Sequence, residues 1–361
     1  MQRSDMRAFY AAHPLILAPM AGVTDPVFRL LCREQGASLA FTEMVSAKGL
    51  SYRNGKTAGL LDLGPGEDSV GVQLFGHEPA TMAAEAVWIA EQMGPALAII
   101  DINMGCPAKK IVTKGDGASL MQRPDEAAAI VEAVVRALDG SGVPVTVKFR
   151  RGFDEGCETA PEFARRMEQA GAWGMTVHGR YARQMYRGRS DDDAVARVVD
   201  AVNVPVVGNG DVHSAERAVE LKRATGCAAL MIARGAEGNP WIFAQCAAAL
   251  DGRPLPPAPS YEERLACAAR HARLLELAEG KRIVKMRKHA MWYLKGIPGA
   301  AEARRRFNDC VSADDFCAVL ADVEAHLAQH GDIVPDGSAP AGAGASRSGA
   351  FVAETNGEGE A

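Results

Sequence analysis

The chain has 361 residues, of which 48% are hydrophobic and 24% charged, a composition typical of a soluble globular protein. Its formal net charge of −5 weakly disfavours a polyanionic partner, and no uncharged apolar run is long enough to span a membrane. The first residues lack the long apolar segment of a secretion signal, and the eight cysteines form no CxxC pair. We therefore expect a cytoplasmic protein without a disulfide framework, a zinc site or any other bound metal.

Short apolar runs alternate with longer amphipathic runs over the first 250 residues. The runs that predict β-strands lie at 15–19, 39–43, 70–75, 97–103, 143–149, 174–179, 204–210 and 228–234. Helices are predicted between and after them, at 25–36, 79–93, 124–138, 159–170, 192–202, 213–225 and 239–249. Strands that are apolar throughout are typical of parallel sheets buried on both faces. Eight such units predict an α/β fold of the (β/α)8 TIM barrel type, with an open doubly wound sheet as the alternative.

The composition changes after the last predicted barrel helix. Residues 1–250 form the predicted barrel, and the Pro-rich stretch 251–260 reads as a linker. Residues 261–330 have a helical pattern without strands, which predicts a small all-helical domain. The Gly-, Ala- and Ser-rich tail 331–361 is predicted to be disordered.

Polar residues gather where the predicted strands end, at the rim that carries the chemistry in this class of barrel. Gln73 and Lys148 end apolar strands; they either mark where a strand reaches water or, for the lysine, stabilise developing negative charge. His178 ends the sixth strand and is either structural or functional. The Gly-rich turn at Ala233 and Arg234, after the eighth strand, offers backbone N–H groups suited to a phosphate.

The segment INMGCPAKK, residues 102–110, places Cys106 on a turn at the end of the fourth strand. A buried cysteine usually behaves as a small hydrophobic residue. Here Gly105 and Pro107 define a bend and Asn103 adds a polar neighbour, so the thiol is suited to meet a substrate. A thiol with the ordinary pKa of ~8.5 is mostly neutral near pH 7 and can donate a proton. From the residues alone, Cys106 is a candidate nucleophile or a candidate proton donor.

An ordered set of motifs at these strand ends resembles the bacterial tRNA-dihydrouridine synthases, and their B-type group in particular. The resemblance is dense over about residues 10–250 and loose in the helical region. Each motif alone is weak, but their order is specific. The motifs are LAPMAGVTDPVFRLLCREQGA, EMVSAKGL, VQLFG, DINMGCPAKKI, GDGASLM, VPVTVKFRRGFD, VHGRYARQMYRG, VPVVGNGDV and GNPWIF.

The resemblance implies an FMN-dependent oxidoreductase that uses NADPH to reduce the C5–C6 double bond of a uridine in the tRNA D-loop to dihydrouridine. It implies that Cys106 is the proton donor, and we hypothesise that Asn103 orients the base. Many relatives have glycine in place of Ala233, so this chain carries one extra methyl group beside the expected phosphate loop. By position, the residues expected to bind FMN are Pro19, Met20, Ala21, Gln73, Lys148, His178, Asn209, Gly210, Asp211, Ala233 and Arg234.

A basic stretch in the helical region is the candidate RNA-binding surface. Residues 281–306 hold nine Lys or Arg and one Glu. Read as one helix, they place Lys281, Lys285, Lys288 and Trp292 on one stripe, suited to RNA phosphates and base stacking. A second stripe suits packing on the domain core, and consists of Ile283, Met286, Ala290, Tyr293 and Ile297. The alternative is a basic face that only contacts water.

Arg180 is a further candidate RNA contact at the barrel mouth, and its alternative is pairing with the acids of residues 190–193. Two other functions remain open. A flavin barrel acting on a free pyrimidine, like dihydroorotate dehydrogenase, leaves the basic helical region unexplained. A non-catalytic RNA-binding regulator leaves Cys106, Lys148 and His178 unexplained. We expect a monomer, although oligomeric state, nicotinamide preference and the target uridine have no signature in the sequence.

Overall fold

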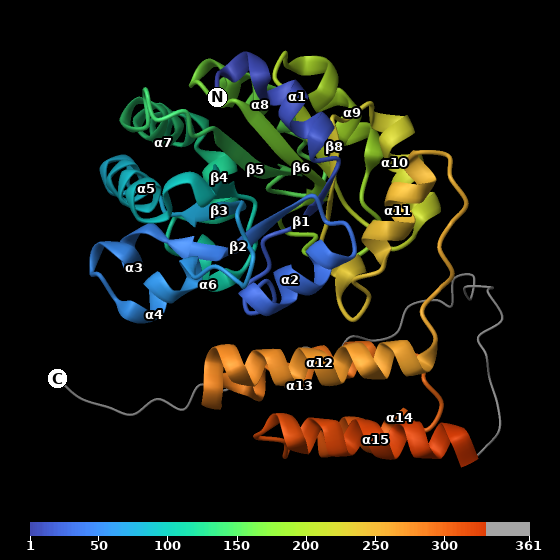
Figure 1. The fold of residues 1–361 in the computed structure, drawn as a ribbon. Helices are drawn as coiled ribbons and strands as arrows, with labels where there is room; N and C mark the ends of the chain where they lie inside the picture. Colours follow the sequence, from blue (N-terminus) through green and yellow to red (C-terminus); the bar gives the residue numbers. More distant parts are fainter. Residues whose placement is uncertain (330–361) are drawn as a thin grey trace.

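The computed structural model describes residues 1–329, apart from the side chains of residues 281 and 282. Eight parallel strands close into a barrel, and β8 pairs with β1 through Leu15 and Leu230 (Figure 1). The predicted (β/α)8 barrel is therefore confirmed, and the open sheet is wrong. The strands are β1 (Leu15–Leu17), β2 (Leu39–Ser46), β3 (Val70–Phe75), β4 (Leu97–Met104), β5 (Val145–Gly152), β6 (Gly174–Tyr181), β7 (Val206–Asn209) and β8 (Ala229–Ile232).

The long helices cover the outside of the barrel, as Figure 1 shows. Four of the seven begin with proline in the first turn, where the missing N–H is not needed. Asp25, Asp191 and Ser214 cap three of them through side-chain oxygens. The helices are α2 (Pro26–Glu34), α5 (Pro79–Met93), α7 (Pro124–Ala137), α8 (Ala160–Gln169), α9 (Asp192–Ala201), α10 (Ala215–Thr225) and α11 (Ile242–Leu250).

Several short elements have no counterpart among the predicted ones. Helix α1 (Met6–Ala12) lies before the first strand, where its buried Met6 and Tyr10 join a core cluster with Ile16, Leu39 and other residues of the strands. The remainder are single turns within the loops, too short to show a helical period. They are η1 (Arg3–Asp5), α3 (Ala47–Ser51), α4 (Gly55–Ala58), η2 (Gly59–Leu61), η3 (Gly94–Ala96), α6 (Lys109–Val112), η4 (Gly117–Gln122) and η5 (Arg234–Ala236).

The C-terminal helices form a second layer beside the barrel, with a hydrophobic core of their own (Figure 1). The apolar stripe predicted from Ile283 to Ile297 is buried in this core. The stripes do not lie on one helix, however, because residues 280–285 form a 3-10 segment before the next α-helix. The elements are α12 (Tyr261–Glu279), η6 (Gly280–Lys285), α13 (Met286–Tyr293), α14 (Ala300–Arg306) and α15 (Ala313–Gln329).

This helical layer rests on the start of α2 and on the loop that precedes it. Val27 packs into the core of the helical layer, and Arg270 of α12 pairs with Glu34 at the end of α2. The Lys288 ammonium donates to the Gly22 carbonyl. Within residues 1–329, no helix combines the length and apolar character that crossing a membrane requires. The predicted tail 331–361 lies outside the described residues.

Candidate active site

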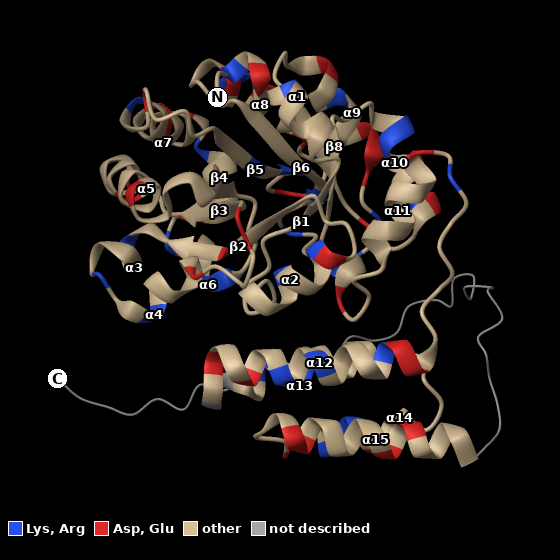
Figure 2. Cartoon of the chain, in the orientation of Figure 1, with Lys and Arg blue, Asp and Glu red and all other residues tan. Residues whose placement is uncertain are grey.

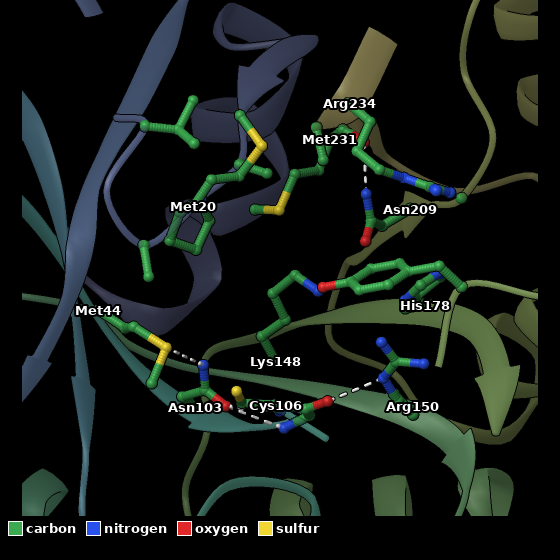
Figure 3. A pocket seen from close by; sticks show the side chains of 18 of the residues that line it. Met20, Met44, Asn103, Cys106, Lys148, Arg150, His178, Asn209, Met231 and Arg234 are labelled. Atoms are coloured by element: carbon green, nitrogen blue, oxygen red, sulfur yellow. Dashed lines mark hydrogen bonds between the residues drawn. The ribbon is translucent and has the colours of Figure 1, made fainter. Parts of the chain in front are cut away.

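A cavity of about 420 Å³ opens at the mouth of the barrel where the strands end. Its lining includes Cys106, Asn103 and every residue that the sequence assigned to the cofactor. Figure 3 shows Cys106, Asn103 and Arg150 on one side of the cavity, Lys148 reaching into it, and Met20 and Met231 opposite. The register explains this convergence. Asn103 lies directly beside Lys148 on the neighbouring strand, and His178 lies directly beside Asn209.

A buried chain of hydrogen bonds crosses the base of the cavity from Asp101 to Asn103. Asp101 accepts from the Gln73 amide and the Thr146 hydroxyl, each at 2.7 Å. The Gln73 carbonyl oxygen accepts from the Asn103 amide at 2.7 Å. Gln73 is thus oriented at both ends, which fixes the face that it presents to a ligand.

The turn that carries Cys106 is held by several contacts. Asn103 Oδ1 accepts from the backbone N–H groups of Gly105 at 3.1 Å and Cys106 at 2.9 Å. Arg150 Nε donates to the Gly105 carbonyl at 2.8 Å, and the Ala118 N–H donates to the Cys106 carbonyl at 3.0 Å. The Asn103 carbonyl oxygen therefore holds the turn while its amide nitrogen donates to Gln73, and because Asn103 also lines the cavity, its role in orienting the base stays a prediction.

The ionisation of the cavity residues follows from their burial. Burial raises the pKa of the Cys106 thiol, so the group stays protonated at neutral pH. Burial, with repulsion from Arg150, lowers the pKa of Lys148 to about 8. Burial raises the pKa of Asp101 to about 6, against the hydrogen bond from Gln73. A neutral acid and a readily neutralised cation therefore share one wall.

Arg150 is a site residue that sequence reasoning missed. It is 3% exposed and also donates to the carbonyls of Tyr181 and Met185, at 3.0 and 2.8 Å. Arg150 lies two residues after Lys148, and residues two apart in a strand point to the same face. This spacing was the signal in the sequence that could have placed Arg150 in the site. Asp101 was missed likewise, although it precedes Asn103 by two residues. Lining residues absent from the expected set include Met44, Tyr186, Met231, His213 and Glu237.

The other end of the cavity is built around Asp211. Burial opposes its ionisation, but hydrogen bonds from His213 and Arg180 lower its pKa well below the usual value. Arg180 donates to both carboxylate oxygens, at 2.7 and 2.8 Å, and Ser190 N–H donates at 2.8 Å. Arg180 is 2% exposed and does not line the cavity. The prediction that Arg180 contacts RNA is therefore at odds with the structure. The alternative is wrong as well, because the acid that pairs with Arg180 is Asp211 and not one of residues 190–193.

His178 is buried beside this ion pair. Its Nε2 lies 3.3 Å from Arg180 Nη1. Because an arginine only donates, Nε2 must accept and the imidazole must be neutral. Burial and the nearby cations lower the pKa of His178 well below its usual value, in agreement with that assignment.

Two glycines of the cavity lining pack too closely against the protein to carry a side chain. A Cβ on Gly210, whose φ is +147°, would lie 2.0 Å from Ser190 Oγ. A Cβ on Gly235 would lie 2.0 Å from the Val212 carbonyl oxygen. Arg234, with its side chain 37% exposed, lines the cavity with them and pairs with Asp211 at 3.4 Å. Glycine-rich turns next to a partly exposed guanidinium suit an anionic group such as a phosphate.

Most side chains of the stripe predicted to bind RNA make contacts within the protein instead. Lys285 pairs with Glu279 at 2.7 Å, and Lys288 binds the barrel loop at Gly22. Trp292 packs against the core of the barrel. The prediction that these three side chains bind RNA is therefore wrong for this structure, because they join the helical layer to itself or to the barrel. The side chain of Lys281 lies outside the described part of the chain.

A closed (β/α)8 barrel with a cationic cavity at the mouth of its strands is the architecture of a barrel enzyme. The profile of the dihydrouridine synthase family matches residues 16–329. The chain belongs to the dihydrouridine synthase family.

Relatives with similar sequences carry names of the same kind. The chain is 42% identical over 308 residues to "tRNA-dihydrouridine synthase B" of Pseudomonas aeruginosa, covering 84% of this chain and 90% of that one. It is 38% identical to the protein of that name from Xanthomonas campestris, with 86% and 92% covered. It is 38% identical to a "Probable tRNA-dihydrouridine synthase" of Mycobacterium tuberculosis, with 86% and 82% covered.

Proposed function

We propose that this enzyme reduces the C5–C6 double bond of a uridine in the tRNA D-loop to 5,6-dihydrouridine, with FMN in the barrel cavity and NADPH as reductant. Family membership and the names of the relatives support the reaction on tRNA. The single observation that carries the mechanism is the Cys106 thiol on a braced turn in the wall of that cavity.

The residues of the cavity fit FMN. The glycine-rich turns at Gly210 and Gly235, with Arg234 beside them, suit the phosphate. The ammonium of Lys148 makes no hydrogen bond within residues 1–329 and is placed to stabilise negative charge on a reduced flavin ring. Gln73 offers an amide of fixed orientation to the same ring. Pro19, Met20 and Ala21 supply an apolar wall. When bound, reduced FMN supplies the hydride that adds to C6 of the uracil.

The residues of this chain supply the proton. Hydride addition at C6 leaves negative charge spread over C5, C4 and O4 of the base, and C5 must then take up a proton. Cys106 holds that proton, because burial keeps its thiol neutral. Asn103 and Arg150 fix the turn, which keeps the thiol in place for the transfer.

The target base must leave the RNA stack to enter this cavity, which requires a hold on the phosphates around it. The lysines of α6 directly follow the Cys106 turn, as Figure 2 shows for the basic residues of that helix. Lys109, Lys110 and Lys114 are exposed, and none of them pairs with an acid among residues 1–329. We therefore include α6 in the proposed tRNA surface, together with the helical domain at 261–330.

The test is substitution of Cys106 by alanine, with the exposed Cys157→Ala as the matched control. We expect C106A to keep bound flavin, its reduction by NADPH and tRNA affinity, and to lose turnover by on the order of 10² to 10⁴-fold. Dihydrouridine formed on unmodified tRNA is measured by mass spectrometry. Full turnover in C106A would remove the thiol from the mechanism, whereas dihydrouracil formed equally well from free uridine would contradict tRNA as the substrate.

A further inference from the structure

Three buried side chains meet where the helical domain rests on the barrel. Asp25 lies at the start of α2, His271 on α12 and His289 on α13. Their exposures are 3%, 0% and 0%. One oxygen or nitrogen from each lies within 4.8 Å of the others. This cluster, Asp25–His271–His289, lies outside the cavity that holds Cys106.

The polar atoms of the cluster are not satisfied by the protein. Within residues 1–329, Asp25 Oδ2, His271 Nε2 and both ring nitrogens of His289 have no hydrogen-bond partner. Leaving such atoms buried and unpaired is unfavourable, so native proteins almost always supply a partner. One such atom from each residue lies within 4.8 Å of the other two, which indicates that a component besides the protein itself lies between them.

The surroundings orient these atoms toward one another. Asp25 Oδ1 accepts from the N–H groups of Val27 and Phe28, at 3.1 and 3.0 Å, as the cap of α2. Oδ2 is left for another ligand. His271 Nδ1 lies 3.4 Å from the Tyr293 hydroxyl. A metal-bound histidine typically holds an oxygen through its other ring nitrogen in this way, and that contact leaves Nε2 for the ion.

We propose that Asp25 Oδ2, His271 Nε2 and one ring nitrogen of His289 bind a divalent transition-metal ion, which fastens the helical domain to the barrel. Two imidazoles and one carboxylate, with a water in the fourth position, are a ligand set that Zn²⁺ favours. Asp25 lies more than 240 residues before the two histidines in the sequence, so no spacing motif marks the set. This explains why the sequence predicted no metal.

The dimensions allow such a site after a small closure. Bonds of about 2.0–2.1 Å at tetrahedral angles place two ligand atoms of one ion about 3.3–3.4 Å apart. Ligand atoms that lie within 4.8 Å of one another therefore need to approach by up to about 1.4 Å. Because two ligands belong to the helical domain and one to the barrel, binding the ion draws the two layers together.

One ligand of the cluster also borders a second cavity. Asp25 lines a separate cavity of about 410 Å³, together with Glu43 and Glu279. These carboxylates add negative charge near the ion. Lys285 lines the same cavity, but it is paired with Glu279 at 2.7 Å, and Lys288 is held at Gly22. The site is therefore not dominated by free cations.

The first test uses the full-length protein with its flavin. Metal content is measured by elemental mass spectrometry as isolated, and again after chelator treatment followed by titration with Zn²⁺ or Co²⁺. We expect an equimolar metal content, a rise in Tm on adding Zn²⁺ back, and visible absorption from tetrahedral Co²⁺. A protein that holds no stoichiometric metal and gains no stability from either ion would overturn the proposal.

The second test assigns the ligands. Asp25→Asn keeps a good helix cap and removes the carboxylate, and His289→Gln removes an imidazole. Asp191→Asn is the matched control, since Asp191 caps α9 through the same kind of bond. We expect Zn²⁺ affinity to fall at least tenfold in D25N and H289Q and to stay unchanged in D191N. Equal affinity in all four proteins would place the ion elsewhere and reject this site. The outcome does not depend on the proposed reaction.

Discussion

Asn103 shows how one side chain can set the geometry of another. Its oxygen accepts from two backbone N–H groups of the Cys106 turn, and its nitrogen donates to Gln73. It is 7% exposed, so water cannot fully replace these bonds. The thiol's position therefore depends on an amide that need not touch the substrate.

Replacing Asn103 by alanine tests this dependence. Two buried N–H groups lose their acceptor, at a cost of about 1–3 kcal/mol, and the turn is free to shift. We expect kcat to fall on the order of 10²-fold with flavin retained, because small displacements of a reacting group are costly. Steady-state kinetics and flavin absorbance measure this. Thr146→Val, which removes a bond at the far side of Asp101, is the control and should change kcat only severalfold.

Lys148 makes the reaction sensitive to alkaline pH. Its pKa of about 8 means that the ammonium is charged below that pH and neutral above it. Arg150, Asp101 and Cys106 are the ionisable groups that act on it. If its charge stabilises the transition state, kcat/KM falls as pH rises through about 8.

Lys148→Arg tests this assignment, because a guanidinium stays protonated throughout the accessible range. We expect the alkaline fall of kcat/KM to move to higher pH in K148R, and to stay in place in the surface control Lys48→Arg. The measurement is a pH–rate profile with saturating NADPH. Identical profiles for wild type and K148R would assign the alkaline fall to another group.

At the residue scale, sequence reasoning located the side chains that end strands. All the residues assigned to the cofactor line one cavity, because the carboxyl ends of parallel strands share one edge. It missed Asp101 and Arg150, whose neighbours in the sequence are apolar or similarly charged. It also read Lys285 and Lys288 as free, because charge patterning does not show which acids and carbonyls the fold brings next to them.

Among the elements, helix α2 depends on a buried ion pair. Arg29 is fully buried and binds Glu67 through Nε at 2.7 Å and Nη2 at 2.6 Å. It also donates to the carbonyls of Thr24 and Asp62, at 2.9 and 2.8 Å. The residue thus ties the loop before α2 to the segment that follows α4.

Arg29→Met should destabilise the fold by about 3–5 kcal/mol, because it leaves the Glu67 carboxylate buried without its partner. Arg33→Met on the same helix is the matched control. Arg33 pairs with Asp68, whose side chain is 85% exposed, and its loss should cost about 1 kcal/mol or less. Urea denaturation followed by circular dichroism compares the two. Equal losses would mean that burial does not control the strength of these pairs.

Long helices were predictable and short ones were not. The seven barrel helices have amphipathic faces over nine or more residues, and each lies within a few residues of its predicted position. Helices α3, α4 and α6 contain five or four residues, fewer than the two turns that a periodic pattern needs. The 3-10 segment at 280–285 was read as α-helix because its apolar spacing fits either form.

On the scale of the whole molecule, the charge distribution predicts how tRNA approaches. Replacing Lys109, Lys110 and Lys114 by alanine removes exposed charge beside the Cys106 turn. We expect the KM for tRNA to rise about tenfold and its salt dependence to weaken, while kcat and flavin content stay unchanged. Arg136→Ala with Arg165→Ala, on the outer helices α7 and α8, is the control. A KM unaffected by the α6 substitutions would move the RNA surface elsewhere.

The contact between Lys288 and Gly22 has a thermodynamic consequence. Gly22 directly follows the Pro19–Ala21 stretch of the cavity wall, and Lys288 belongs to α13 of the helical domain. A molecule that displaces α13 must therefore strain or relax the wall that a second molecule occupies. Free energy is a state function. The factor by which the molecule at α13 changes the dissociation constant of the molecule in the cavity therefore equals the factor by which the molecule in the cavity changes that of the molecule at α13.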